Sequence, residues 1–213
     1  RGHFASFVDV AVAAGIVVGL FLLAFPAIQN SRFHARRFTC ADHLRQIGLG
    51  LTQYSETYDG YFPPVYEGGR HSGAGIYAPI LVSHQLVDGS HWFVCPGSPV
   101  ADNPQFRVPS LEELLTASFE EFARWRAEMG GSYGYNLGFQ EHGSYHPPRN
   151  LGRSFYAILA DVPSNTLPGR QSANHGGRGQ NVLQEDGSVR FCKSSTSLDQ
   201  ADDIFVNYCA EAA

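Results

Sequence analysis

The sequence lacks an excess of positive charge, and only 16% of its 213 residues are charged at all. Lysine and arginine together number 15 against 20 aspartate and glutamate residues, which gives a formal net charge of −5. A domain that binds duplex nucleic acid normally carries a basic face, so we expect no nucleic acid among the partners. The length suits one ordinary domain whose core is large enough to fold without the help of disulfide bonds or bound metals.

Several short motifs that mark common catalytic and metal sites are also missing. The sequence contains no C-x-x-C pair, no H-E-x-x-H pattern and no Walker phosphate loop. It also has no dense run of Asp and Asn of the kind that forms an EF-hand calcium loop. We therefore expect a chain that uses no cofactor and is not an enzyme. A membrane-anchored periplasmic enzyme or binding module remains an alternative.

Long apolar runs are absent with one exception, residues 7–25, in which Asp9 is the single charged residue. About 20 apolar residues are needed to cross a bilayer as a helix, so this run is just long enough. Apolar residues keep helical spacing beyond Pro26, with polar residues between them. We predict one helix of about 50 residues. The chain then divides into an N-terminal helix, residues 1–57, and a head domain, residues 58–213.

Charge is distributed unevenly between the beginning of the chain and the rest. Residues 1–37 carry four basic groups and one acid, whereas the remaining 176 residues carry 11 basic and 19 acidic groups. The first block is therefore positive by three charges and the remainder negative by eight. The first block also contains the apolar run, which indicates an anchor, a signal peptide or a packing element.

Three features of the apolar segment favour packing against other helices. Ala11, Gly15 and Gly19 recur every four residues, a small-residue stripe that allows close approach, although such residues are common in membrane helices anyway. Asp9 is a carboxylate in an apolar helix, where a charged group by default has a partner. Pro26 removes one backbone hydrogen bond within the helix and permits a kink. We predict that these five residues serve assembly.

The segment resembles the N-terminal helix of type IV pilins and type II secretion pseudopilins. Asp9 and Pro26 lie 17 residues apart, which matches the acid-to-proline spacing of that family. Its usual start has Gly followed by Phe and a Glu at the fifth mature position, whereas this chain has Gly2-His3-Phe4 and Asp9. Further motifs are similar to a prepilin-like branch abundant in planctomycete bacteria, and they are carried by Cys40, Leu44, Gln46, Ile47, Gly48, Leu49, Phe62, Pro63 and Pro64.

A second part of this resemblance lies near the C-terminus. His175 is followed by Asp186-Gly187 with ten residues between, and the prepilin-like branch has a similar motif in which His and Asp-Gly are separated by nine. Asp186-Gly187 also stands between two strand-like runs, which is a strong hairpin signal for residues 181–191. The resemblance thus covers both ends of the chain, and the middle matches only loosely.

The resemblance implies an α+β, pilin-like fold in which the long N-terminal helix packs on a small antiparallel sheet, with an extra amphipathic helix in the head. It implies a structural subunit of an extracellular type IV pilus-like filament on the bacterial surface. The partners would be copies of the chain in a helical homopolymer, the inner membrane before assembly, its assembly machinery and a prepilin peptidase. A minor pseudopilin of a type II-like secretion machine is the nearest alternative.

Within the head, composition shifts to Gly, Pro, Tyr and Phe, which suits short strands and loops. Ser110 and Glu113 form a predicted capping box that begins a helix over residues 110–129. We predict further strands at residues 91–95, 132–137 and 155–161.

A metal site is conceivable if the loop after residue 161 folds over the sheet, because Asp161, His175 and Asp186 would then meet. Calcium, which some pseudopilins bind in a C-terminal loop, needs six to eight oxygen ligands, and this spacing does not supply them. A hairpin turn explains Asp186, and a loop hydrogen bond explains His175. We therefore expect no metal, with calcium as the less favoured alternative.

The four cysteines are Cys40, Cys95, Cys192 and Cys209. A chain that passes through a membrane reaches an oxidising compartment, where an even count favours two disulfides. Three pairings are possible. We favour Cys192–Cys209, which would tie the C-terminal segment to the hairpin, and Cys40–Cys95, which would tie the helix to the head. Four reduced, buried thiols are the alternative.

Overall fold

A computed structural model describes residues 6–66, 68–141, 144–196 and 203–205. The chain has the predicted α+β architecture, with a long N-terminal helix, a four-stranded antiparallel sheet and several short helices. Helix α1 spans Phe7–Thr57, 51 residues, and continues through Pro26. The prediction of a single helix of about 50 residues is therefore confirmed. Contacts divide the chain into two compact units, Arg1–Arg36 and Arg37–Ala213.

The first unit contains the apolar part of α1. An 18-residue window of this helix has a mean hydropathy of 2.5, so its length and composition suffice to cross a membrane. Its large apolar side chains, from Phe7 to Ile28, are 50–88% exposed. Such a surface is stable only when lipid or protein covers it. The segment therefore indicates a membrane anchor or a signal sequence.

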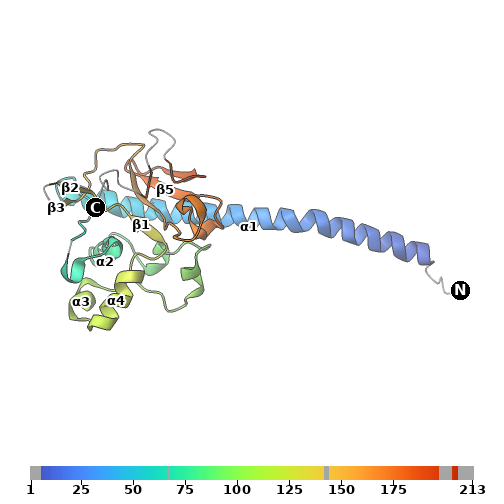
Figure 1. Ribbon diagram of the computed structural model, residues 1–213, viewed down its shortest axis with the longest axis horizontal. Coiled ribbons are helices and arrows are strands. Elements are labelled where there is room, and N and C mark those ends of the chain that lie inside the picture. Colours follow the sequence, from blue (N-terminus) through green and yellow to red (C-terminus); the bar gives the residue numbers. More distant parts are fainter. Residues whose placement is uncertain (1–5, 67, 142–143, 197–202, 206–213) are drawn as a thin grey trace. The chain divides into compact units, whose positions relative to one another are not determined.

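The second unit is built around a sheet with the strand order β1-β4-β5-β6, in which every neighbouring pair is antiparallel (Figure 1). The strands are β1 Tyr133–Tyr135, β4 Ala157–Asp161, β5 Gln180–Gln184 and β6 Val189–Cys192. A separate hairpin pairs β2, Phe139–Glu141, with β3, Ser144–His146. The predicted strands at 132–137 and 155–161 and the hairpin around Asp186-Gly187 are confirmed.

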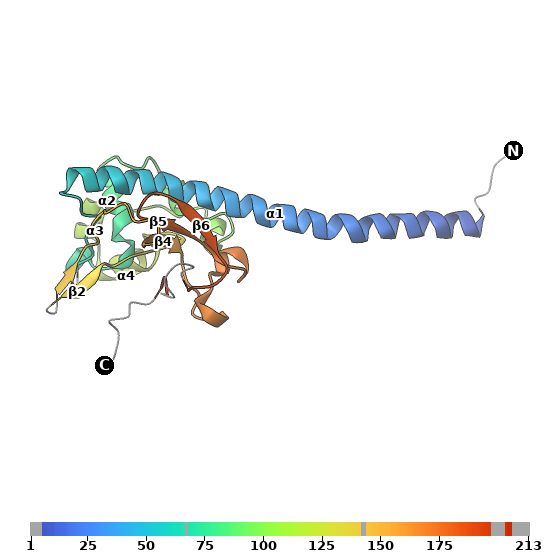
Figure 2. The same cartoon turned by 90° about the horizontal axis from the view of Figure 1, so that it is seen from above.

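The part of α1 after Arg37 lies along this sheet (Figure 2). One face of that segment is fully buried, with Cys40, Leu44, Ile47 and Leu51 all at most 1% exposed. Gly48 lets the helix approach β5, because a Cβ at this position would lie 3.0 Å from a methyl group of Leu183. The second half of the helix is therefore part of the head's own core.

Three further helices pack on the same core, namely α2, Tyr77–Ser83, α3, Leu111–Thr116, and α4, Phe119–Glu128. The single helix predicted over residues 110–129 is wrong, because the chain breaks at Ala117. The capping box of Ser110 and Glu113 is present, and Ser118 and Glu121 form a second one that starts α4.

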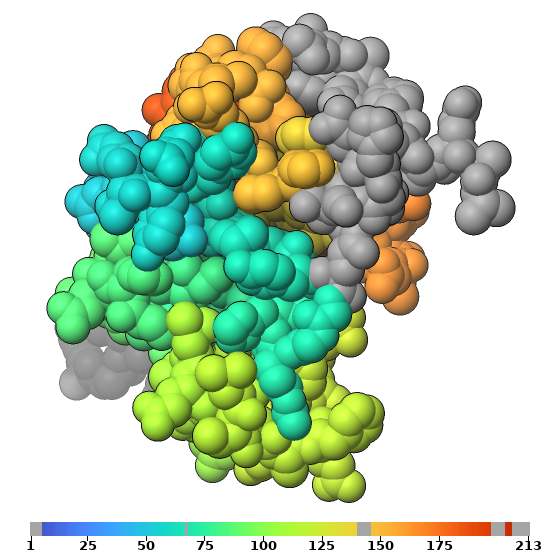
Figure 3. Space-filling model, turned by 90° about the vertical axis from the view of Figure 1, so that its left-hand side faces the viewer, coloured from blue at the N-terminus to red at the C-terminus, as the bar shows by residue number. Residues whose placement is uncertain are grey.

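The short helix η1, Gly69–His71, packs against α4, and the space-filling view shows their segments, in teal and yellow-green, side by side (Figure 3). The guanidinium carbon of Arg70 lies 5.1 Å from the ring centre of Phe122. This cation–π contact covers the apolar side of α4.

The predicted strand at residues 91–95 is also wrong, because Ser90–Phe93 forms a short 3₁₀ helix, η3. Gly89 has a φ of 111°, which turns the chain just before η3. The indole nitrogen of Trp92 donates to Asp88 at 3.0 Å, and Phe93 is fully buried. The HWFV segment therefore turns and places Phe93 in the core, and it does not add a strand to the sheet. The other short helices are η2 Ala74–Ile76, η4 Pro99–Asp102, η5 Pro168–Arg170 and η6 Ala173–His175.

Candidate functional site

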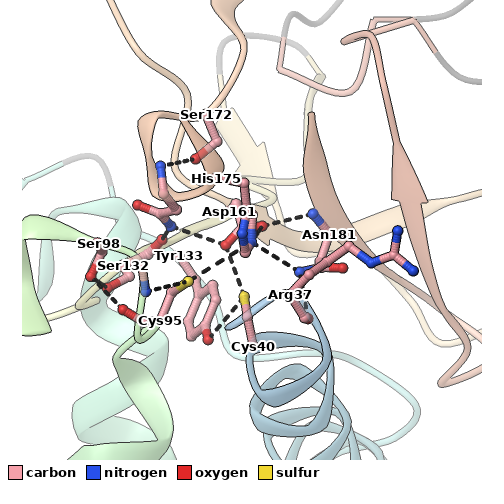
Figure 4. Close-up of polar contacts among 12 residues, drawn as sticks. Arg37, Cys40, Cys95, Ser98, Ser132, Tyr133, Asp161, Ser172, His175 and Asn181 are labelled. Carbon is pink, nitrogen blue, oxygen red and sulfur yellow. Dashed lines mark hydrogen bonds and ion pairs between the residues drawn. The ribbon is translucent and has the colours of Figure 1, made fainter. Parts of the chain in front are cut away.

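Four side chains that can bind metals or exchange protons converge inside the second unit (Figure 4). Cys40 comes from α1, Cys95 from the turn after η3, Asp161 from the end of β4 and His175 from the end of η6. All four residues are at most 3% exposed. One sulfur, nitrogen or oxygen atom of each lies within 4.8 Å of those of the other three. We call these four residues the buried cluster.

Asp161 is the centre of the cluster's hydrogen bonds. Its Oδ1 accepts hydrogen bonds from the Cys40 thiol and from the side-chain amide of Asn174, both at 3.0 Å. Its Oδ2 accepts from the backbone N–H of Asn181 at 2.7 Å and lies 3.0 Å from Nε2 of His175. A buried carboxylate is costly unless it is paired and hydrogen-bonded, and here both oxygens are satisfied.

The two sulfur atoms each receive a hydrogen bond from outside the cluster. The Tyr133 hydroxyl donates to Cys40 Sγ at 3.5 Å, and the backbone N–H of Gly97 donates to Cys95 Sγ at 3.5 Å. Cys95 Sγ also lies 3.8 Å from Nε2 of His175. Donors that point at sulfur stabilise negative charge on it.

Burial and pairing set the charge state of this arrangement. Burial lowers the pKa of His175, but hydrogen bonds to Asp161 and Cys40 outweigh it and raise the pKa to about 9. Burial raises the pKa of the Cys40 thiol far above its ordinary value. Pairing therefore favours the protonated form of the His175 imidazole, and burial favours the neutral form of the Cys40 thiol.

Glycines allow the four segments to approach one another. A Cβ at Gly97 would collide with the backbone oxygen of Asn174, so only glycine lets the Cys95–Gly97 turn lie against η6. Gly176 ends η6 in the left-handed region with a φ of 64°, which turns the chain back toward β5. Asn181, at the second position of β5, then reaches both Asp161 and Nε2 of His175, the latter at 3.1 Å.

The family to which the chain belongs is shown by its sequence. Residues 29–143 match the family model described as a protein of unknown function, DUF1559. The chain belongs to the DUF1559 family. This match includes Cys40 and Cys95 and agrees with the resemblance to prepilin-like proteins of the planctomycete type. No curated protein and no solved structure matches the chain.

The sequence of this DUF1559 protein suggested Asp161, His175 and Asp186 as metal ligands. The structure brings only two of them together. Asp161 and His175 are in contact, as that hypothesis required. Asp186 is exposed in the β5–β6 turn, where its Oδ1 accepts hydrogen bonds from the backbone and hydroxyl of Ser188. Cys40 and Cys95, rather than Asp186, lie beside Asp161 and His175 in the buried cluster. No spacing rule predicts them, because Cys40 and Asp161 are 121 residues apart.

The favoured disulfide between Cys40 and Cys95 is not present. Both residues are free thiols, although their sulfurs lie within 4.8 Å of each other. Cys40 instead donates to Asp161, and Cys95 faces His175. The other favoured pair includes Cys209, which lies outside the described residues, and its partner Cys192 is buried.

The residues predicted to serve assembly lie in the first unit. The Asp9 carboxylate accepts a hydrogen bond from the backbone N–H of Ser6 at 2.9 Å, and the Ser6 hydroxyl accepts from Val8 at 3.2 Å. Asp9 thus completes a capping arrangement at the start of α1, a role not predicted from the sequence. Gly15 and Gly19 have open space where a Cβ would be added. Ala11 and Pro26 lie in the same helix.

Residues 130–134 match the G-x-S-x-G pattern of a serine nucleophile elbow. In such an elbow the serine follows a strand and is exposed at a turn into a helix. Ser132 instead precedes β1, is fully buried and pairs with the hydroxyl of Ser98 at 2.6 Å. The geometry assigns Ser132 to packing around the buried cluster.

Proposed function

We propose that this DUF1559 protein is a structural subunit of an extracellular, type IV pilus-like filament that polymerises through its N-terminal helix. The observation that carries the proposal is the apolar part of α1, whose large side chains are at least 50% exposed from Phe7 to Ile28. Family membership supports a pilin-like surface protein. The exposed helix must be covered, first by the inner membrane and then by the same helix of other subunits.

Assembly of this kind requires little hydrophobic driving force, because lipid and a helix bundle are equally apolar. Close packing then decides which arrangement forms. Ala11, Gly15 and Gly19 present the small surface that such packing needs, and Gly15 and Gly19 have no neighbour within 4 Å at the Cβ position. A head-to-tail contact that does not close propagates as a filament. The acidic heads would form its surface and keep it soluble.

Assembly of this kind also requires partners other than copies of the chain. Before assembly the chain is held in the inner membrane, where a prepilin peptidase processes it and assembly machinery moves it into the fibre. A minor pseudopilin of a secretion machine would use the same helix in a short filament. Its low abundance in purified surface fibres would distinguish it from the main subunit.

The first test enlarges the small-residue stripe. A Gly15→Leu, Gly19→Leu double variant keeps the helix apolar and able to insert, but it blocks close approach of a second helix. We expect normal membrane levels and at least a tenfold loss of fibres, measured by negative-stain microscopy and immunoblotting of sheared surface material. Val18→Leu, which enlarges a neighbouring position, is the matched control. Wild-type fibre yield in the double variant would contradict the proposal and favour a simple anchor.

The second test concerns Asp9, which we propose pairs with the N-terminus of a neighbouring subunit. Asp9→Ala removes both this pairing and the local cap, whereas Ser6→Ala removes only the hydroxyl part of the cap. We expect fibre yield to fall strongly in Asp9→Ala and to stay near wild type in Ser6→Ala. Equal yields in both variants would restrict Asp9 to capping.

A further inference from the structure

We infer that the buried cluster is a structural zinc site in which Cys40, Cys95, Asp161 and His175 bind one Zn²⁺. This inference is independent of the filament proposal, because it concerns the head alone. No motif in the sequence indicates it, since the four ligands come from four separate segments.

The donor atoms select the metal. Thiolate sulfur, imidazole nitrogen and carboxylate oxygen are all ligand types that zinc binds, and four of them suit its tetrahedral coordination. Calcium and magnesium require oxygen ligands, and the cluster offers one carboxylate. Four protein ligands leave no position for substrate or water, so the site fits a structural rather than a catalytic zinc.

The distances are already close to those of a zinc site. Tetrahedral bonds of about 2.0–2.3 Å place neighbouring ligand atoms about 3.3–3.8 Å apart. Nε2 of His175 lies 3.8 Å from Cys95 Sγ and 3.0 Å from Asp161 Oδ2, and Cys40 Sγ lies 3.0 Å from Asp161 Oδ1. All four ligand atoms lie within 4.8 Å of one another, so shifts of about 1 Å would admit the ion.

The surrounding groups also suit anionic ligands. Tyr133 donates to Cys40 Sγ, Gly97 to Cys95 Sγ, and Asn174 and Asn181 to Asp161. Outer groups of this kind orient metal ligands and stabilise their charge. The side-chain amide of Asn181 contacts Nε2 of His175 at 3.1 Å, and zinc would replace this contact. That amide also donates to the backbone oxygen of Arg37 at 3.2 Å, so it keeps a partner.

Binding has a defined proton balance. The two thiol protons and the one proton shared by His175 and Asp161, three in all, leave to solvent, and Zn²⁺ takes their place between the four ligand atoms. The resulting site carries two thiolates, one carboxylate and a neutral imidazole around a divalent cation. A metal that joins α1 to three other segments of the head stabilises the folded state only, so its binding free energy adds to folding stability.

The experiment uses the full chain, purified in detergent and without chelator from cells grown with added zinc. Elemental mass spectrometry is expected to find about one zinc per chain, as in other closed four-ligand sites. Replacement by Co²⁺ reports on the wild-type site without mutation, through tetrahedral visible bands and a thiolate charge-transfer band. Calcium alone is expected not to bind. Absence of zinc from the wild type, or cobalt without thiolate bands, would overturn the proposal.

Two variants identify the ligands. Cys40→Ser retains a hydroxyl that can donate to Asp161, so circular dichroism is expected to remain native while zinc is lost. Asp186→Asn changes the exposed carboxylate of the β5–β6 turn and is expected to retain zinc. Loss of zinc in Asp186→Asn, or its retention in Cys40→Ser, would overturn the assignment. So would a Cys40–Cys95 disulfide in chain isolated from the cell surface, detected by peptide mass spectrometry.

Discussion

At the scale of single residues, the head depends on a few positions where no other side chain fits. Gly97 is the clearest, since a Cβ there would meet the backbone oxygen of Asn174 rather than a movable side chain. Backbone cannot shift as cheaply as a side-chain tip, so the turn carrying Cys95 would move away from η6. The geometry of the buried cluster therefore requires glycine at position 97, because a methyl group there would displace the turn that carries Cys95.

We predict that Gly97→Ala lowers the free energy of unfolding by about 1–3 kcal/mol, the usual cost of overpacking. Gly68→Ala is the matched control, because Gly68 has a φ of −154° and open space at its Cβ position. Chemical denaturation of the head, followed by near-ultraviolet circular dichroism, measures both. Equal stability of the two variants would show that the turn adapts without cost.

A second residue-scale feature is the ion pair between Arg153 and Glu185. The Glu185 side chain is fully buried and accepts three hydrogen bonds from Arg153 at 2.8–2.9 Å. Burial by itself raises the pKa of Glu185, but these hydrogen bonds outweigh it and hold the pKa below its ordinary value of 4.5. A lowered pKa contributes stability above the unfolded-state value and loses it as pH falls.

We predict that Glu185→Gln lowers the free energy of unfolding by about 1.5–3 kcal/mol at pH 7, the range for hydrogen bonds to charged groups. The difference from wild type is expected to shrink as pH falls below the ordinary pKa of 4.5, where the unfolded chain begins to protonate Glu185, and to disappear once the native carboxyl is protonated at its lower pKa. Thermal unfolding between pH 3 and pH 7 measures it. Glu120→Gln, at an exposed position, should show no comparable pH dependence.

At the scale of elements, the sequence predicts well where periodicity and turn chemistry agree. The hairpin around Asp186-Gly187 and the 51-residue α1 are such cases. The prediction fails where two helix-start signals lie within one continuous apolar pattern. Residues 110–129 contain two capping serines, and the second, Ser118, ends the first helix by starting another. Helical spacing continues across the break by chance, so Phe119 is 81% exposed while Leu114 is buried.

We predict that Ser118→Ala lowers the free energy of unfolding by about 1 kcal/mol, the usual value of an N-cap. Ser118→Asp keeps an oxygen that accepts from the N–H of Glu121 and should retain most of the stability. Denaturant titration compares the two variants. A result in which the alanine variant matches wild type would mean that tertiary packing, rather than capping, sets the start of α4.

At the scale of the whole molecule, the second half of α1 belongs both to the long helix and to the compact unit of the head. The sequence separates helix from head at residue 57 by composition, and the contacts group residues Arg37–Ala213 into one compact unit. The buried face of α1 after Arg37 fills the head's core, so this part of the helix cannot be removed without exposing it. The sequence suggested Asp161 with His175 and Cys40 with Cys95 as two separate pairs, and only the tertiary fold joins the two pairs into the buried cluster.

We predict that a fragment of residues 37–213 is folded and soluble, whereas residues 58–213 do not fold. The shorter fragment lacks Leu44, Ile47, Leu51 and Tyr54, each worth about 1.5–3 kcal/mol when buried. Their sum approaches the whole stability of an ordinary domain. Circular dichroism and size-exclusion chromatography compare the fragments. If residues 58–213 folded on their own, the head would not need α1 to complete its core.

The span of the buried cluster along the chain has a consequence for the order of folding. Cys40 meets Asp161 across 121 residues, and Cys95 meets His175 across 80. Contacts so distant in sequence close late, because the intervening chain must first be ordered. During synthesis the two cysteines therefore emerge long before the histidine and aspartate that hold them apart. Until both residues are in place, none of the described contacts holds the two thiols apart, so the incompletely folded chain is the state in which a Cys40–Cys95 disulfide would form.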